Sequence, residues 1–239
     1  MFSPSLEKRL PTTVNVLALA GIVALTGACA SSQQQDLPEV DKDGLELVKN
    51  TRHSAAYVDP DADFSEFNRV AIADVEVAFR KNWLRDQNDT RASLSRRVTQ
   101  EDADKIKAAV AEEFTRVFTE ELEKGGYEVV DFGGFENSAS DLLVLAPAIV
   151  NLDVTAPDTM SPGRSRTYTA STGSMTLYLE FHDSVSGALL GRFVEAKEIG
   201  DTGTTMQISN SVTNKADADR EFRQWAQKLV AKLDEVHGK

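Results

Sequence analysis

The chain of 239 residues contains a single cysteine, Cys29, and its thiol could carry distinctive covalent chemistry. Apolar and small residues run from Val14 to Ala28 before it, and the cationic pair Lys8 and Arg9 precedes that run. A charged start, a short apolar stretch and small residues at a cleavage point are the layout of a secretory signal peptide. We therefore expect residues 1–28 to be removed and residue 29 to become the mature N-terminus.

The residues around this cysteine, Leu25-Thr26-Gly27-Ala28-Cys29, resemble a bacterial lipobox. In a lipobox the cysteine thiol takes a diacylglyceryl group, and fatty-acyl chains such as palmitate then hold the protein in a membrane. Each buried methylene contributes about 0.8 kcal/mol, so two or more chains anchor a protein stably. The residue directly after the cysteine is Ala30 rather than aspartate, which resembles the signal for export of a lipoprotein to the outer membrane. The resemblance implies a lipoprotein of the cell envelope, anchored in the outer membrane and facing the periplasm.

Two other interpretations of this stretch are a transmembrane helix and a buried helix with a chance cysteine. The fifteen residues from Val14 to Ala28 would rise about 22 Å as a helix, less than the ~30 Å hydrocarbon core of a bilayer. The polar run from Ser31 to Gln35 follows at once and offers a buried helix nothing amphipathic to join. Both interpretations are therefore weaker than lipidation.

The composition is strongly acidic, with a formal net charge of −12 that becomes −13 once Glu7, Lys8 and Arg9 leave with the signal peptide. This balance disfavours nucleic acid and anionic lipid surfaces as general partners. No second cysteine is present to form a disulfide, so the fold must depend on its core. A chain of this length can bury roughly 70% of its unfolded surface, which suffices for one domain.

Candidate catalytic and metal-binding residues are few. The three histidines, His53, His182 and His237, have no ligand neighbours at metal-binding spacing, and none of the common nucleophile, phosphate-loop or zinc motifs occurs. His182 beside Asp183 could be half of a catalytic pair, although a histidine beside a turn aspartate more often ends a solvated hairpin. We predict no catalytic residue, no metal and no cofactor.

Two polar segments, residues 81–98 and 155–172, concentrate arginines in this acidic chain, and the first also contains a tryptophan. Brought together, they would form a cationic patch with an aromatic platform, suited to an envelope protein or an anionic glycan. The alternative is that the arginines pair with the protein's own carboxylates and that the tryptophan packs onto the sheet. The predicted partner-binding residues are Trp83, Arg85, Arg96, Arg97, Arg164 and Arg166.

Two amphipathic helices are predicted to support these segments. Thr99 to Asp102 is a capping-box pattern, an apolar stripe follows from Ile106 to Leu122, and Gly125-Gly126 ends the helix. A second stripe runs from Phe222 to Val236 near the C-terminus. Five strands are expected at residues 69–79 with a bulge near Asp74, 127–132, 142–154 with Pro147 at a bulge or local edge, 175–182, and 189–199, the last two forming a hairpin.

The predicted fold is a single α+β domain with about five mixed strands and both long helices packed on one face of the sheet. The expected organisation is a lipoprotein signal peptide over residues 1–28, a lipidated N-terminus and flexible tether over 29–56, and a periplasmic domain over 57–239.

Three features resemble a family of bacterial lipoproteins known as domain of unknown function 3313. They are the entry Tyr57-Val58-Asp59-Pro60 with Phe64 and Val70, the turn from Asp183 to Leu190, and the closing Phe222-Arg223-Gln224-Trp225-Ala226. The resemblance covers roughly residues 45 to 236. That family has no established activity, so the resemblance implies no site residues.

Three functions remain open from the sequence. The leading hypothesis is a non-enzymatic binding or scaffolding lipoprotein whose sheet or loops engage another envelope component. The alternatives are a periplasmic hydrolase without a recognisable motif and a purely structural envelope protein.

Overall fold

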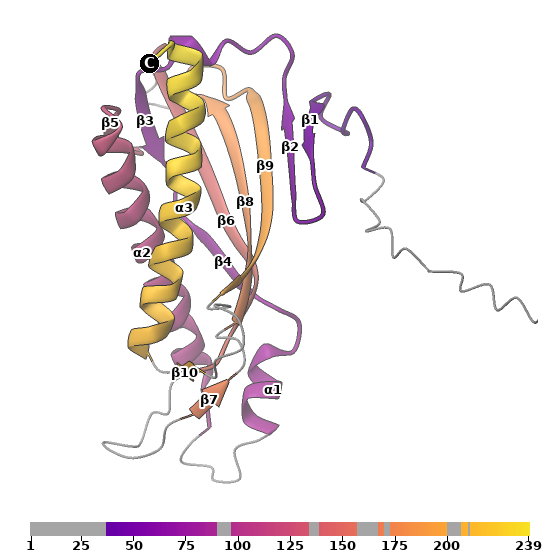
Figure 1. Cartoon of the computed structure of the whole chain (residues 1–239), viewed down its shortest axis with the longest axis vertical. Helices are drawn as coiled ribbons and strands as arrows, with labels where there is room; N and C mark the ends of the chain where they lie inside the picture. The colour runs from indigo at the N-terminus through magenta and orange to yellow at the C-terminus, as the bar shows by residue number, and fades with distance from the viewer. Residues whose placement is uncertain are drawn as a thin grey trace, which may run out of the picture. The chain divides into compact units, whose positions relative to one another are not determined.

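Two long helices lie against the same face of a mixed β-sheet (Figure 1). They are α2 (Gln100–Lys124) and α3 (Ser211–His237). The computed structural model describes residues 37–89, 97–133, 139–156, 167–169, 173–199, 207–209 and 211–239. The predicted lipidation site, Cys29, lies outside the described residues.

The sheet contains eight strands within these described ranges, in the order β1-β2-β9-β8-β6-β3-β5, with β4 pairing separately with β6. From β1 through β2, β9 and β8 to β6, each strand is antiparallel to the next. On its other side β6 runs parallel to β3 and β4, and β5 runs parallel to β3. Their bounds are β1 (Glu46–Asn50), β2 (Ser54–Val58), β3 (Arg69–Ile72), β4 (Glu76–Phe79), β5 (Glu128–Asp131), β6 (Leu142–Val154), β8 (Gly173–Asp183) and β9 (Leu189–Ile199). The smaller elements are η1 (Phe64–Glu66), α1 (Trp83–Asp89), and the two-stranded pair β7 (Thr167–Thr169) and β10 (Gln207–Ser209).

The central strand β6 has the bounds that the sequence predicts, and Pro147 explains how its neighbours are arranged. β3 pairs with residues 142–145 of β6, and β4 pairs with residues 148–152. Pro147 falls between these two paired stretches, where a missing backbone N–H costs no ladder bond on that side. The predicted local edge at Pro147 is confirmed. The single strand predicted over residues 69–79 with a bulge near Asp74 is instead two strands, β3 and β4, which pair separately with β6.

The helix α2 begins and ends at the predicted signals. The Thr99 side chain accepts a hydrogen bond from the Asp102 backbone N–H, and the Asp102 carboxylate accepts one from the Thr99 backbone N–H. Gly126 follows the helix with φ of 84°, a left-handed conformation that suits glycine. The chain then enters β5 parallel to β3, so β3, α2 and β5 form the expected crossover unit.

The hydrophobic core lies between the two helices and one face of the sheet. Phe114 and Phe222 have exposed fractions of 0%, Trp225 has 2%, and the Phe114 ring meets Phe222 edge-on with 5.4 Å between centroids. From the sheet, alternate residues of β6 and β8 point into the same cluster, including Leu143, Leu145, Ile149, Met175, Leu177 and Leu179. The prediction that both helices cover one sheet face is confirmed.

Ion pairs link the polar edges of the two helices. The Arg116 guanidinium of α2 lies 2.6 Å from Glu113 on its own helix and 2.5 Å from Asp219 on α3. A second pair between the helices has its arginine on α3 and its carboxylate on α2, where Arg223 binds Glu121. Hydrogen bonding to Arg116 lowers the pKa of the buried Glu113 carboxyl to about 2. The acidic composition is therefore partly neutralised at the seam between the helices.

The structure differs from the predicted element list in three further places. Residues 46–58 form β1 and β2, so the predicted domain boundary at residue 57 falls inside a strand and residues 46–56 belong to the sheet rather than to a tether. The segment 81–98, predicted as a loop, contains α1. β7 lies in the polar segment 155–172, and β10 lies between the predicted strand at 189–199 and the C-terminal helix, so more strands are present than the five expected. All of these elements are short, with at most seven residues each, so local periodicity gives little signal for them.

The two core aromatics of the helices offer a direct test of this packing. Truncating Phe114 or Trp225 to alanine should lower the free energy of unfolding by about 3 to 5 kcal/mol, because each ring fills space between helix and sheet. Urea denaturation of each variant measures the loss. The control is Val185→Ala in the hairpin turn, where the side chain is 60% exposed and the change should stay within about 0.5 kcal/mol. A loss below about 1 kcal/mol for either aromatic would contradict the packing.

Candidate functional site

The tryptophan of the predicted cationic patch is buried rather than exposed. Trp83 has an exposed fraction of 1%, and its ring stacks on Phe79 with 3.7 Å between centroids. Its indole N–H donates to the Val154 carbonyl oxygen at 2.7 Å, which ties α1 to the end of β6. The prediction that Trp83 presents an aromatic platform to a partner is wrong, because the indole is needed to dock α1 on the sheet.

The arginines of the patch do not gather around an exposed aromatic within the described residues. The Arg85 side chain is 66% exposed and pairs with Asp86 at 3.0 Å, as the alternative of internal pairing expects. Arg97 is exposed beside Val98, whose backbone N–H and C=O both bind the Asn88 side chain. The remaining predicted patch residues, Arg96, Arg164 and Arg166, lie outside the described residues.

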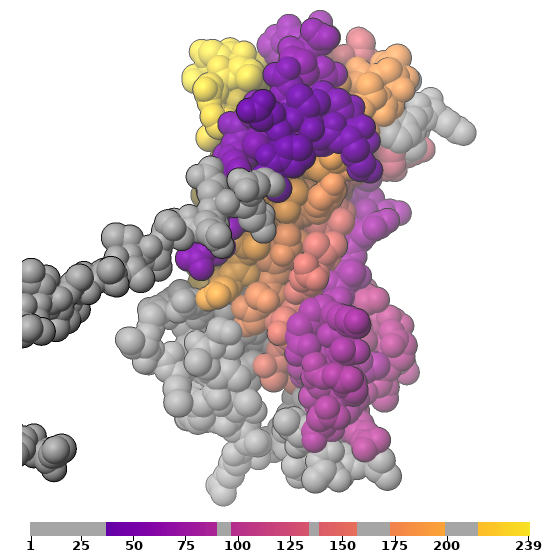
Figure 2. Space-filling model, turned by 90° about the vertical axis from the view of Figure 1, so that its right-hand side faces the viewer, coloured from indigo at the N-terminus to yellow at the C-terminus, as the bar shows by residue number. Residues whose placement is uncertain are grey.

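The sheet face opposite the helices provides a different surface. Figure 2 shows β6, β8 and β9 open to view on this side, between the N-terminal residues at one end and α1 at the other. Because successive side chains of a strand point to opposite faces of the sheet, the residues that do not point into the core lie on this face. Cross-strand pairing aligns them in rows: Ala148 with Tyr178, Val194 and Ala55, and Val150 with Thr176 and Ala196.

These rows consist of small or apolar side chains, apart from the hydroxyls of Tyr178 and Thr176. Ala196 is exposed, and Ala148, Val150 and Val194 are half-buried although no described element packs over them. Small side chains allow a second surface to approach close to the strand backbone. Removing such apolar area from water contributes about 25 cal/mol per Å². This open sheet face, defined by the two rows, is therefore suited to contact with another molecule.

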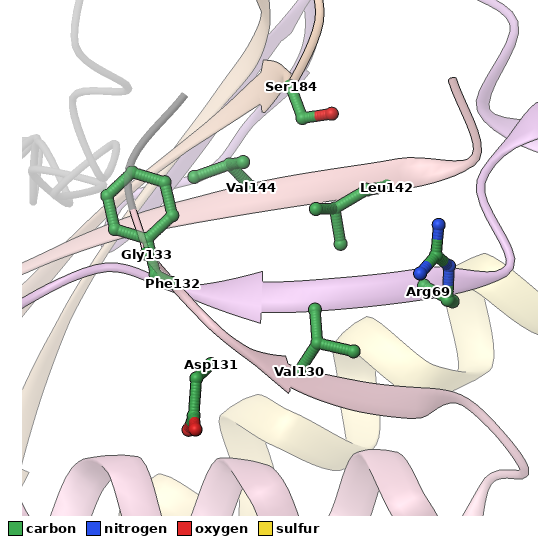
Figure 3. Close-up of a pocket in the computed structure, with 8 residues that line it drawn as sticks. All are labelled: Arg69, Val130, Asp131, Phe132, Gly133, Leu142, Val144 and Ser184. Atoms are coloured by element: carbon green, nitrogen blue, oxygen red, sulfur yellow. The ribbon is translucent and has the colours of Figure 1, made fainter. Parts of the chain in front are cut away.

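A hollow with a volume of about 210 Å³ lies at the β6-β3-β5 end of the same side of the sheet (Figure 3). Its apolar floor comes from Val130, Leu142 and Val144, with Phe132 at one end. Arg69 borders it and makes a two-pronged pair with the Asp141 carboxylate, with N···O distances of 2.9 and 2.6 Å. This hydrogen bonding lowers the pKa of Asp141, so the pair stays ionised as a rim for the hollow.

The hydroxyl that lines this hollow is committed to the backbone. Ser184 Oγ donates to the Ala139 carbonyl oxygen at 2.7 Å and accepts from the Ala139 N–H at 3.1 Å. Ser184 is 1% exposed, and its own N–H donates to the Leu142 carbonyl oxygen. The side chain thus fastens the β8–β9 turn to the start of β6, which is a structural use of a serine rather than that of an activated nucleophile.

The candidate catalytic pair also has structural contacts. The Asp183 carboxylate accepts hydrogen bonds from the N–H groups of Val185 and Ser186 inside the hairpin turn, and these bonds lower its pKa. One His182 ring nitrogen lies 3.3 Å from the Gly187 carbonyl oxygen, and the other lies 3.4 Å from the Glu180 carboxylate. In the described part of the chain, no cluster of His, Cys, Asp or Glu suits a metal ion, and no helix is long and apolar enough to cross a membrane.

A charged cluster that the sequence analysis missed lies in the row next to the open sheet face. The row pairs Ala146 with Glu180, Arg192 and Tyr57 across β6, β8, β9 and β2. The Arg192 guanidinium binds Glu180 at 2.9 Å and also reaches Asp41 and Asp43, at 2.5 and 2.6 Å. The hairpin register could have predicted the Glu180 pair, but nothing local connects Arg192 with residues about 150 positions earlier.

The sequence matches a family described as "Protein of unknown function (DUF3313)" over residues 39–229. The chain belongs to this family. The matched range includes β1 and β2, in agreement with a folded domain that begins before residue 57. No curated protein matches the sequence.

Several solved structures are similar to this fold at low sequence identity. The PelC dodecamer from Paraburkholderia phytofirmans is 11% identical with a TM-score of 0.38, over 73% of this chain and 96% of that chain. A DUF330 protein from Xanthomonas campestris is 14% identical with a TM-score of 0.35, over 69% and 82% of the two chains. A DUF4136 family protein from Bacteroides thetaiotaomicron is 16% identical with a TM-score of 0.30, over 73% and 95%. Similarities at this level support no statement about function.

The burial of Trp83 gives a prediction opposite to that for an exposed platform. Trp83→Ala should lower the free energy of unfolding by about 3 to 5 kcal/mol. Trp83→Phe keeps a ring against Phe79 but leaves the Val154 carbonyl without its indole donor, so its cost should be about 1 to 3 kcal/mol. Denaturant titration compares both with Arg85→Ala, an exposed control expected to change stability by less than about 0.5 kcal/mol. Unchanged stability in Trp83→Ala would restore the exposed-platform interpretation.

Proposed function

We propose that this protein is an outer-membrane-anchored periplasmic lipoprotein and that it acts as a non-enzymatic binding or scaffolding component of the cell envelope. In this proposal the open sheet face contacts another envelope protein. The observation that carries the binding role is the pair of cross-strand rows, in which small and apolar side chains from four strands share one face that no described element covers.

The anchoring part of the proposal is supported by the lipobox pattern ending at Cys29 and by where the folded domain begins. Pro38 already contacts the domain, because its carbonyl oxygen accepts a hydrogen bond from the Tyr57 hydroxyl. Eight residues, 30–37, separate this contact from Cys29 and can span at most about 28 Å when fully extended. The domain would thus be held close to the membrane, where a partner in the same membrane is within reach.

The binding part is supported by the chemistry of the face. Two rows of small and apolar residues favour a protein partner that presents apolar side chains, because contact would remove those groups from water. A stable interface of ordinary size buries about 800 Å² on each partner, so the partner would extend beyond the two rows onto neighbouring residues. An anionic glycan bound at the arginine segment has less support, because Trp83 is not available as its platform.

The anchor is tested by replacing the one thiol. Cys29→Ser should give a protein that takes up no labelled palmitate and retains its signal peptide or appears in the soluble fraction, since no other side chain can accept the diacylglyceryl group. Metabolic labelling and membrane fractionation measure both effects, and Ser31→Ala is the control that should label normally. Palmitate incorporation into Cys29→Ser at the wild-type level would exclude the anchor.

The binding face is tested by a matched pair of alanine-to-arginine variants. Ala196→Arg places a long cation on the open sheet face, whereas Ala109→Arg places the same side chain at an exposed position of α2. Chemical crosslinking in intact cells should lose its partner bands in Ala196→Arg and keep them in Ala109→Arg, while both proteins keep wild-type melting temperatures. Loss of the bands in Ala109→Arg alone would move the contact surface to the helices.

A further inference from the structure

Arg192 joins two parts of the chain that are remote in sequence. Its side chain is only 10% exposed and contacts three carboxylates, those of Asp41, Asp43 and Glu180. The guanidinium also lies 5.5 Å from the centroid of the Tyr178 ring on the open sheet face. Glu180 and Tyr178 belong to β8, whereas Asp41 and Asp43 belong to the segment that leads back toward Cys29.

The segment Pro38–Leu45 is organised around the same aspartates. Asp41 turns one carboxylate oxygen toward Arg192, while the other accepts hydrogen bonds from the backbone N–H groups of Asp43 and Leu45. Leu45 is 2% exposed, and the Leu47 N–H donates to the Glu39 carbonyl oxygen. The turn is also closed by its own backbone, since the Asp41 N–H donates to the Leu45 carbonyl oxygen and the Gly44 N–H to that of Asp41. These bonds are local to the segment, whereas Arg192 ties it to β8 and β9.

Electrostatics makes this contact conditional on Arg192. Three carboxylates surround one guanidinium, so the site has an excess of negative charge even when every contact is made. Hydrogen bonding to Arg192 lowers the pKa of Asp43, which keeps that carboxylate ionised at neutral pH. Without the guanidinium, the cation left beside these aspartates is the 85% exposed Lys42, 3.8 Å from Asp43, and Asp41 and Asp43 would repel Glu180.

The segment Pro38–Leu45, which Arg192 contacts, lies beside the open sheet face. Figure 2 shows the indigo N-terminal residues lying at one end of the exposed surface of β8 and β9. The row held by Arg192, Glu180 and Tyr57 is adjacent to the row of Tyr178 and Val194. The segment thus borders the open sheet face at its Tyr178 end and covers Tyr57, which is 8% exposed and whose hydroxyl donates to the Pro38 carbonyl oxygen.

We propose that Arg192 is the clasp of a strap formed by Pro38–Leu45, and that opening the strap both uncovers the row of Tyr57 and Arg192 beside the open sheet face and lengthens the connection to the anchor. The regulatory meaning of the strap rests on the proposed lipid anchor and binding face. Closed, the connection is the eight residues 30–37. Open, it gains the eight residues 38–45, which add at most about 28 Å of reach. A partner that favours the exposed face would favour the open strap, because the two states are linked.

Hydrogen–deuterium exchange of the purified full-length protein in detergent micelles tests the clasp. In Arg192→Gln the amides of Leu45 and Leu47 should exchange at least tenfold faster than in the wild type, while the amides of β6 keep their rates. The control Arg80→Gln also removes an arginine that pairs with two carboxylates, Asp86 and Asp153, but it lies away from the strap and should leave both amides unchanged.

A second variant approaches the contact from the strap side. The double variant Asp41→Asn, Asp43→Asn leaves the sheet intact and should accelerate the same two amides. Unchanged exchange of Leu45 and Leu47 in both variants would overturn the clasp, and so would an acceleration that extends equally into β6. The measurement requires neither acylation nor a partner, so its failure is distinguishable from failure of the anchor or of the binding face.

Discussion

Both long helices must bury their apolar stripes, and a single face of one sheet receives both of them. The contact of Phe114 with Phe222, and of both helices with β6 and β8, is the centre of the core. Because this packing uses one face completely, every alternate residue of the long strands is left on the other side. The helix arrangement therefore leaves the open sheet face uncovered. Packing within the described chain does not explain why the two rows on that face consist of small and apolar residues.

Polar groups reinforce the same arrangement rather than compete with it. On the helix side of β9, the buried Glu195 carboxylate accepts hydrogen bonds from the Trp225 indole at 2.8 Å and from the Lys228 ammonium at 2.8 and 2.9 Å. A buried carboxylate without such partners would cost several kcal/mol. The ion pairs of Arg116 and Arg223 fix the helices to each other. An acidic chain thereby folds with many of its buried carboxylates opposed by cations.

The sequence predicts the elements whose signals are local. Four such features are found in the structure: the capping box at Thr99, the apolar stripe of α2, the bounds of β6 and the turn at Asp183. Each of them depends on residues that are close together in the sequence. Trp83 shows where such reasoning stops. Its place was decided by Phe79 and by Val154, about seventy residues later, so composition alone made a core residue resemble part of a binding patch.

The hairpin of β1 and β2 at the edge of the sheet shows the same limit of local sequence patterns. β1 and β2 are each five residues long, and β2 pairs with β9, a partner that the local sequence does not reveal. The contact of Arg192 with Asp41 and Asp43 also depends on that pairing. For this reason the predicted boundary of the domain fell too late, and the candidate surface moved from the arginine loops to the sheet.

The central claim is that the open sheet face, rather than the helix layer, contacts a partner. Site-specific photocrosslinking in intact cells tests it most directly, with a benzophenone side chain introduced in place of Thr176 on the open sheet face or in place of Glu112 at an exposed position of α2. The account predicts a discrete crosslinked product from position 176 and none from position 112. Products from position 112 with none from position 176 would contradict it.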